Sequence, residues 1–181
     1  GPISDVPQDN PGAPNQEVIN DLRTNGVSIS QVSESSNYLQ VSFISVPEDI
    51  NDLLPRMESI ATNVTWIKLG NTGLDDNAMQ FIRRYKNLTR LGLERTKVTD
   101  KGMENLKDLQ KLRVLNLTGT QVSLTGLRFI SGLKSLRSVN IYQTLITTAE
   151  YQETVGLFPQ AHVEMGGYEV PTLATDTTVV K

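Results

Sequence analysis

A period of 24 residues constrains this sequence more than any other feature. Threonine recurs at that spacing without an insertion, at Thr72, Thr96, Thr120 and Thr144. Apolar residues follow the same period in three further columns: Ile67, Leu91, Leu115 and Val139; Leu69, Leu93, Leu117 and Ile141; Leu74, Val98, Val122 and Ile146. Repetition at a fixed period of this length is typical of solenoids, in which each unit packs only against its neighbours. We therefore predict a solenoid for residues 64–168.

Each unit combines two spacings. In the copy that begins at Leu88, Leu91 and Leu93 alternate as in a strand, and later apolar residues are three positions apart, as on a helix that packs on a core: Met103, Leu106 and Leu109. Helix-capping side chains lie between the two halves, at Asp75, Thr99, Ser123 and Thr147, and small residues follow three positions later, at Ala78, Gly102 and Gly126. We predict strand, turn, helix and turn in every unit.

The repeat pattern L-x-x-L-x-L-x-x-(N/C/T)-x-L resembles the leucine-rich repeat consensus over residues 64–168, with a looser copy at 38–63. The resemblance implies an α/β solenoid with a parallel sheet on its concave face and short helices on its convex face. The ninth position, which holds Asn or Cys in most of that family, is Thr here. A hydroxyl both donates and accepts, so we expect it to bond to the backbone of the turn.

The two ends of the array should differ from its middle, because an ordinary terminal repeat would leave an apolar face in water. We expect an N-terminal cap and degenerate first repeat in residues 15–63, with helices at 15–24 and 53–60 and strands at 27–32 and 38–43. Residues 64–168 hold the repeats and a C-terminal cap that ends in a strand at 160–166. Residues 1–14 are interpreted as a linker with a tag remnant, and residues 169–181 as a flexible tail.

Composition removes several kinds of chemistry. The chain has no cysteine, which excludes disulfides, zinc–thiolate sites and thiol nucleophiles. No apolar run is long enough for a membrane helix, so we expect no direct membrane insertion. His162 and Glu164 share a strand face but lack further metal ligands, and no nucleophile elbow precedes a helix. We therefore expect no catalytic residues, no metal and no cofactor, and hence no enzyme.

Charge is uneven along the chain. Residues 1–63 carry two basic and nine acidic side chains, residues 64–137 carry fourteen and six, and residues 138–181 carry one and five. The basic residues of the middle block are scattered near predicted helix ends, where cations complement the helix dipole. We interpret them as a solvated face and expect no nucleic-acid partner. Asn63, Asn87 and Asn116 begin Asn-x-Thr triplets, but the first two occupy equivalent repeat positions, so repetition accounts for them.

Side chains beside the two leucines of each strand should point away from the core, onto the concave face. The candidate ligand-binding residues on this face are Trp66, Lys68, Arg90, Glu94, Arg95, Asn116, Asn140, Tyr142, Gln143 and His162. They include the single tryptophan of the chain, and aromatic and Arg side chains commonly anchor protein interfaces. The alternative is that Trp66 only packs on Phe43 and Arg90 across neighbouring strands.

A narrower resemblance comes from the sequence motif L-x-x-T-x-V-T-D-x-G-M, from Asn37-Tyr38-Leu39 and from the segment 64–70. It is similar to repeats of membrane-anchored Bacteroidota and planctomycete proteins that carry a c-type cytochrome domain, which implies a periplasmic or otherwise extracytoplasmic location. We expect a monomeric, non-catalytic binding module for a protein, or alternatively for a polysaccharide. The alternative function is a structural spacer, or an intramolecular docking domain for an adjacent c-type cytochrome domain.

Overall fold

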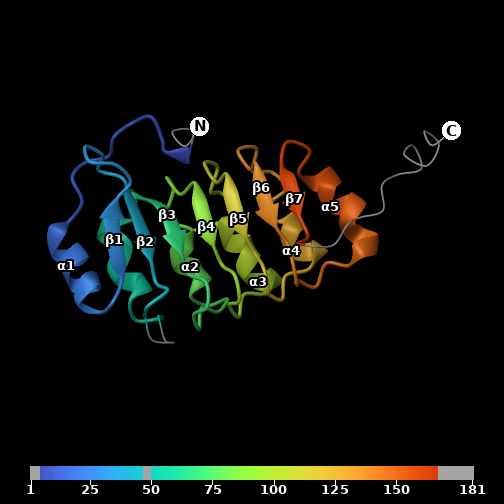
Figure 1. The fold of residues 1–181 in the computed structure, drawn as a ribbon, viewed down its shortest axis with the longest axis horizontal. Coiled ribbons are helices and arrows are strands. Elements are labelled where there is room, and N and C mark those ends of the chain that lie inside the picture. The colour runs from blue at the N-terminus through green and yellow to red at the C-terminus, as the bar shows by residue number, and fades with distance from the viewer. Residues whose placement is uncertain (1–4, 47–49, 167–181) are drawn as a thin grey trace.

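The computed structural model describes residues 5–46 and 50–166 (Figure 1). The predicted tail at 169–181 lies outside these ranges. The chain alternates strands with short helices, in the order α1 (Gln16–Thr24), β1 (Ser28–Gln31), β2 (Leu39–Ser42), η2 (Leu54–Ile60), β3 (Val64–Lys68), α2 (Met79–Ile82), β4 (Arg90–Gly92), α3 (Asp100–Met103), η3 (Glu104–Leu106), β5 (Val114–Asn116), α4 (Leu124–Arg128), β6 (Ser138–Asn140), η4 (Thr148–Glu150), α5 (Tyr151–Leu157) and β7 (His162–Glu164).

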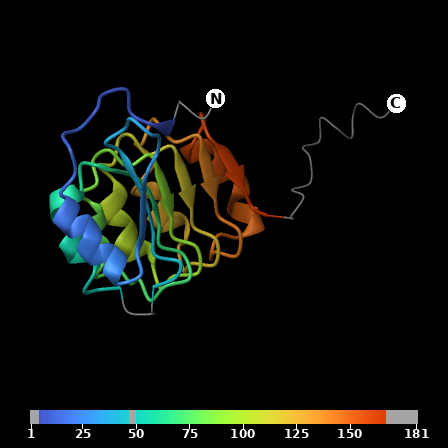
Figure 2. The same ribbon diagram turned by 60° about the vertical axis from the view of Figure 1, so that its left-hand side comes forward.

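The strands form one seven-stranded sheet in sequence order, from β1 to β7. β1 is antiparallel to β2, and all later neighbours are parallel. Residues 24 apart are register partners, as in the row Trp66, Arg90, Val114, Ser138 and His162. Figures 1 and 2 show the strands side by side with the helices of the repeats along one face of the sheet. The predicted α/β class is confirmed, and the arrangement is that of a leucine-rich-repeat-like solenoid.

The core lies between the sheet and the helices. The two apolar strand columns are buried, with Ile67, Leu69, Leu91, Leu93, Leu115, Leu117, Val139 and Ile141 each 2% exposed or less. The helical half contributes Met79, Met103, Leu106, Leu127 and Ile130, which are fully buried. Each layer is completed by the next unit, because a single unit has too few apolar neighbours to cover its own edges.

The threonine column bonds to the backbone as predicted. The hydroxyls of Thr72, Thr96, Thr120 and Thr144 each donate to the carbonyl oxygen three residues earlier, at 2.6, 2.8, 2.7 and 2.7 Å. At the first and last of these positions, the hydroxyl also accepts from the backbone N–H two residues later, at 3.3 Å. The same turn is therefore built in four successive units by the same side-chain contact.

Thr120→Val is expected to lower the free energy of unfolding by about 1 kcal/mol, because the buried carbonyl of Leu117 loses the hydroxyl donor and keeps only the backbone N–H of Thr120, at 3.1 Å. The matched control is Thr125→Val, at an exposed position of α4, which should change stability by no more than about 0.5 kcal/mol. Urea unfolding measures both values. Equal stability of the two variants would contradict the role given to the column.

A second contact joins consecutive units at the helix starts. Thr99 and Ser123 cap α3 and α4, as predicted, through their side-chain oxygens. The carboxylate of Asp76 accepts from the backbone N–H and the hydroxyl of Thr99, and Asp100 accepts from the same two groups of Ser123. The acid of one unit therefore holds the helix cap of the next.

The glycines of this region make room for these acids. A Cβ added at Gly102 would lie far inside van der Waals contact of Asp76 Oδ1, and one at Gly126 would meet Asp100 Oδ1 in the same way. The helix start of the fifth unit, residues 136–159, lacks such an acid, because Leu124 in the preceding unit stands where Asp76 and Asp100 stand in earlier units. There Glu150 occupies the glycine position, and its Oε1 accepts from the N–H and the hydroxyl of Thr147, at 2.9 and 3.0 Å. Glu150, which departs from the repeat pattern, thus supplies the carboxylate contact that Leu124 cannot make.

At the N-terminal end, α1 begins at Asn15, whose side chain accepts from two backbone N–H groups, and its buried face carries Ile19 and Leu22. The degenerate repeat has a 3₁₀ helix, η2, where we expected a helix of the repeat, and the apolar residues named for it are buried: Leu53, Leu54, Met57 and Ile60. No helix within residues 5–46 and 50–166 has the length and apolar character needed to cross a membrane.

Candidate functional site

The candidate residues on the strands point away from the core. Trp66 and Lys68 belong to β3, Arg90 to β4, Asn116 to β5, Asn140 to β6 and His162 to β7, and all of them are half-buried or exposed. The residues of the two apolar columns, which alternate with them along the strands, are buried, so the two faces of the sheet are chemically distinct. We call the side that carries these six residues the open face.

The other four candidates, Glu94, Arg95, Tyr142 and Gln143, lie in the turns after the strands. Arg95 and Gln143 have φ values of 53° and 56°, in the left-handed region, and belong to a column with Asn71 and Gly119 at 59° and 71°. Tyr142 is 39% exposed, and Gly166 lies so close to its ring that a Cβ there would overlap the ring atoms. Tyr142 is thus covered in part by the C-terminal segment of the described chain.

A groove of about 540 Å³ lies on the open face, over β2 to β5. Five of the candidates line it: Trp66, Lys68, Arg90, Glu94 and Asn116. It also contains the 56% exposed side chain of Ile44. Arg95, Asn140, Tyr142, Gln143 and His162 do not line this groove, so the structure divides the predicted set into two groups.

The side chain of Glu94 lies over Gly70 and Gly92. A Cβ at Gly70 would overlap the carboxyl group of Glu94, and one at Gly92 would lie 2.8 Å from Glu94 Oε2. That oxygen is buried, and within the described part of the chain it has no hydrogen-bond partner. The two glycines thus let a carboxylate lie against the floor of the groove.

The Trp66 side chain packs against one of the two neighbours that we expected. The guanidinium of Arg90 stacks over the indole, 4.5 Å from the ring centroid, in a cation–π contact. The other expected neighbour was wrong: Phe43 is fully buried in the core, and the partner of Trp66 in β2 is Gln40. The error arose because Phe43 follows the end of β2, where its side chain enters the apolar layer instead of the open face.

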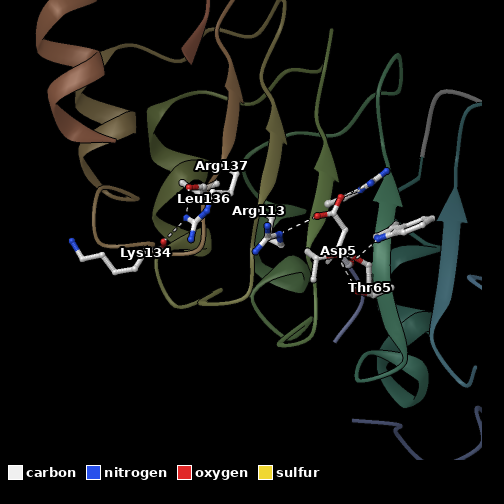
Figure 3. A network of polar contacts seen from close by, with 9 residues as sticks. Asp5, Thr65, Arg113, Lys134, Leu136 and Arg137 are labelled. Atoms are coloured by element: carbon white, nitrogen blue, oxygen red, sulfur yellow. Dashed lines mark hydrogen bonds and ion pairs between the residues drawn. The ribbon is translucent and has the colours of Figure 1, made fainter. Parts of the chain in front are cut away.

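The strongest polar contacts at the groove come from Asp5, a residue that the sequence placed in a linker. Its carboxylate accepts from Arg90 Nε at 2.8 Å, from Arg90 Nη2, and from Arg113 Nε at 2.9 Å (Figure 3). Its backbone carbonyl accepts from the indole N–H of Trp66 at 3.1 Å and from the hydroxyl of Thr89. Residues up to 108 positions apart thus meet at one side chain.

The rest of the segment is also held. Tyr38 donates to the Asp9 carboxylate at 2.9 Å, Asn37 bonds to Asn10 and Pro11, and the amide of Asn63 donates to the Gly12 carbonyl at 2.8 Å. Figures 1 and 2 show this segment passing from α1 along the edge of the sheet to the ends of the middle strands. Residues 5–14 therefore differ from the flexible linker that we expected, because polar groups of the first repeats bind their carbonyls and side chains.

Sequence reasoning also missed Thr89 and Arg113 as site residues. They belong to a further 24-residue column, Thr65, Thr89, Arg113 and Arg137. The last three residues directly precede β4, β5 and β6, whereas Thr65 lies within β3. Arg137, one repeat beyond Arg113, instead donates to the carbonyls of Lys134 and Leu136, at 2.8 and 2.9 Å (Figure 3). The column could have drawn attention to these positions, but only the structure shows which arginine meets the carboxylate.

The surroundings of the segment change two pKa values. Burial, the largest single influence, raises the pKa of Asp5, but the hydrogen bonds and charges of Arg90 and Arg113 together outweigh it, so the pKa is below its ordinary value of 3.8. Burial and the hydrogen bond to Asp9 raise the pKa of Tyr38 to about 12. At neutral pH the segment is therefore held by an ionised Asp5 and a protonated Tyr38.

Acid should release Asp5. Because its pKa is lower in the folded state, folding favours the carboxylate, and this stabilisation is complete above pH values near 3.8 and lost as the pH falls through the lowered pKa. Trp66 fluorescence reports the contact, since Trp66 is the only tryptophan and bonds to Asp5. We expect constant emission from pH 8 to 5, a change below pH 4, and in Asp5→Asn the changed emission at every pH. An identical titration of both proteins would contradict the contact.

The other charged side chains considered in the sequence form local pairs. On β7, His162 Nε2 lies 3.1 Å from Glu164 Oε2, and both side chains are exposed. No cluster of three or more metal-binding side chains occurs among the residues that the structure describes. Several basic residues of the middle block pair with acids on the helical side, including Arg84 with Glu58, Lys107 with Glu104 and Arg128 with Glu153. These exposed pairs are consistent with a solvated face.

Comparison with known proteins gives a limited result. No family model matches the chain, and no curated protein does either. Among solved structures, the chain is similar to the actin-binding site 2 of leiomodin-1, with a TM-score of 0.49 and 21% identity over 61% of this chain and 72% of that one. It is also similar to the leucine-rich repeat ectodomain of the receptor kinase SOBIR1 from Arabidopsis thaliana, with a TM-score of 0.46 and 16% identity over 75% of this chain and 83% of that one. Both TM-scores are below 0.5.

Proposed function

We propose that this chain is a non-catalytic protein-interaction module of the leucine-rich-repeat type, which binds an extended segment of a partner protein on the open, concave face of its sheet. The observation that carries this proposal is the groove over β2 to β5. It combines basic side chains, an amide, an exposed aliphatic side chain and a buried carboxylate oxygen without a partner in the described chain. A concave site with convergent polar groups is the usual form of a binding site.

The groove favours a protein over a polysaccharide. One face of the Trp66 ring is stacked against Arg90, which leaves less of the ring for a sugar. Lys68, Arg90 and Glu94 offer charges of both signs, and Ile44 offers an apolar contact, which matches the mixed chemistry of a peptide. Because the groove is built on a sheet whose register is fixed by the repeats, it needs little ordering when a ligand binds. An extracytoplasmic location and an adjacent cytochrome domain are hypotheses that rest on the resemblance of the repeat motifs.

Selection from a library of random short peptides tests this function. Enriched peptides should bind the native chain and lose at least tenfold in affinity for the double variant Lys68→Glu, Asn116→Arg, which changes the groove without touching Asp5 or its partners. The matched control is Lys134→Glu, because Lys134 is exposed and does not line the groove. Circular dichroism melts confirm that the variants fold. If no enriched peptide distinguishes the groove variant from the control, the chain is better described as a structural spacer.

A further inference from the structure

The contacts of Asp5 form a complete recognition site for one acidic residue. Its two carboxylate oxygens face three N–H groups, two from Arg90 and one from Arg113. The side chain of Asp5 is only 14% exposed, whereas those of Arg90 and Arg113 are 40% and 27% exposed. Charge-assisted hydrogen bonds from arginine to a carboxylate are among the stronger polar contacts in proteins, and partial burial strengthens them further.

The site also binds the backbone of the residue that occupies it. The indole N–H of Trp66 and the hydroxyl of Thr89 both donate to the backbone carbonyl of Asp5. A free inorganic anion would satisfy the guanidinium groups but would leave the indole N–H of Trp66 without its acceptor and the Thr89 hydroxyl with only the longer contact to the Thr65 carbonyl, at 3.2 Å. The arrangement therefore suits an aspartate within a peptide, since only a peptide offers a side-chain carboxylate and a backbone carbonyl at this separation.

An aspartate of another protein could make the same contacts as Asp5. All donors bind groups that any aspartate in a peptide possesses, and the two arginines leave one positive charge uncompensated by Asp5. Trp66 and Arg90 also line the groove, so a ligand lying in the groove reaches the site directly. The segment is anchored separately at Asp9, Asn10 and Gly12, so Asp5 can leave its site while these later contacts remain.

We propose that Arg90, Arg113, Trp66 and Thr89 form a binding site for an aspartate in a peptide segment of a partner protein, and that Asp5 occupies this site as an internal competitor. The inference rests on the proposed function, because it names the chemistry of the partner. Tethering gives Asp5 a high effective concentration at the site. A partner peptide therefore binds with an affinity reduced by the fraction of time for which the site is filled.

A peptide supplied in trans tests the proposal on the full chain. The probe is a fluorescent, amidated hexapeptide with the sequence of residues 3–8, Ile-Ser-Asp-Val-Pro-Gln, and the control peptide has Asn in place of Asp. The host variant is Asp5→Arg, whose positive charge is repelled by Arg90 and Arg113. Fluorescence anisotropy should show the Asp peptide binding Asp5→Arg at least tenfold more tightly than the native chain. The Asn peptide should bind Asp5→Arg at least tenfold more weakly than the Asp peptide.

Two further variants make the result specific. Glu34→Arg, at an exposed turn, makes the same change in net charge and should bind the probe no better than the native chain does. Adding Arg90→Ala and Arg113→Ala to Asp5→Arg should abolish binding, with folding checked by circular dichroism. Equal affinity for the Asp and Asn peptides, or no gain in Asp5→Arg, would overturn the proposal. Groove-dependent peptides from the library selection would then still support the interaction function, so the two failures can be told apart.

Discussion

Gly126→Ala is expected to lower the free energy of unfolding by about 2–4 kcal/mol, through overpacking and the loss of a buried polar contact. A Cβ at this position would overlap Asp100 Oδ1 and would lie 3.0 Å from Val122 Cγ1 and 3.1 Å from Asp100 Cα. Asp100 cannot move aside without giving up the N–H of Ser123, to which it bonds at 2.6 Å, and the Ser123 hydroxyl. One methyl group therefore disturbs the contact that joins two units.

The matched control is Gly132→Ala. Gly132 lies in the exposed turn after α4, and nothing stands within 4 Å of the place where its Cβ would be. Alanine there should change stability by less than about 1 kcal/mol, with a gain expected if only the entropy of the unfolded chain is affected. Urea unfolding of both variants decides the matter. A Gly126→Ala protein as stable as the Gly132→Ala protein would show that Asp100 does not link the units as described.

Asn63→Leu is expected to lower the free energy of unfolding by about 2–4 kcal/mol, because it leaves two part-buried carbonyl groups without their donor. Asn63 is 4% exposed, and its side-chain amide donates to Gly12 at 2.8 Å and to Asn37 at 3.1 Å. It thereby ties the N-terminal segment to the start of the sheet. Loss of this tie should also make the backbone amide proton of Asn37, which donates to Asn10 Oδ1 at 3.1 Å, exchange faster, as hydrogen exchange measures.

Asn87 provides the control from within the repeat. It stands 24 residues after Asn63, at the equivalent position, but it is half-buried and not fully buried, and its amide donates to the Thr62 carbonyl at 2.7 Å in an exposed contact. Asn87→Leu should therefore cost no more than about 1 kcal/mol, since water can replace the lost contact. If both variants lose the same stability, the effect belongs to the repeat position and not to the N-terminal segment. The equivalence that we drew between these residues from the sequence holds for position but not for burial.

Much of the fold followed from the sequence because the repeats are regular. Leu91 and Leu93 had to share a buried face with their equivalents 24 residues away, since one unit cannot cover its own apolar edge, and the register of the strands agrees. The hydroxyl contacts of the threonine column followed from the chemistry of the side chain. The acid that caps the next helix did not, because Asp76 reads equally well as a residue of its own helix start.

The candidate site was predictable only in part. Alternation along the strands identified Trp66, Lys68, Arg90 and Asn116 as residues of the open face, and these residues line the groove. The sequence alone determined that repeated side chains 24 apart lie side by side, because stacking converts a period along the chain into a row in space. Only the tertiary structure decided that Asp5 meets Arg90 and Arg113. That contact lies outside any period, since residues 5–14 occur once and their position depends on which distant polar groups can satisfy them.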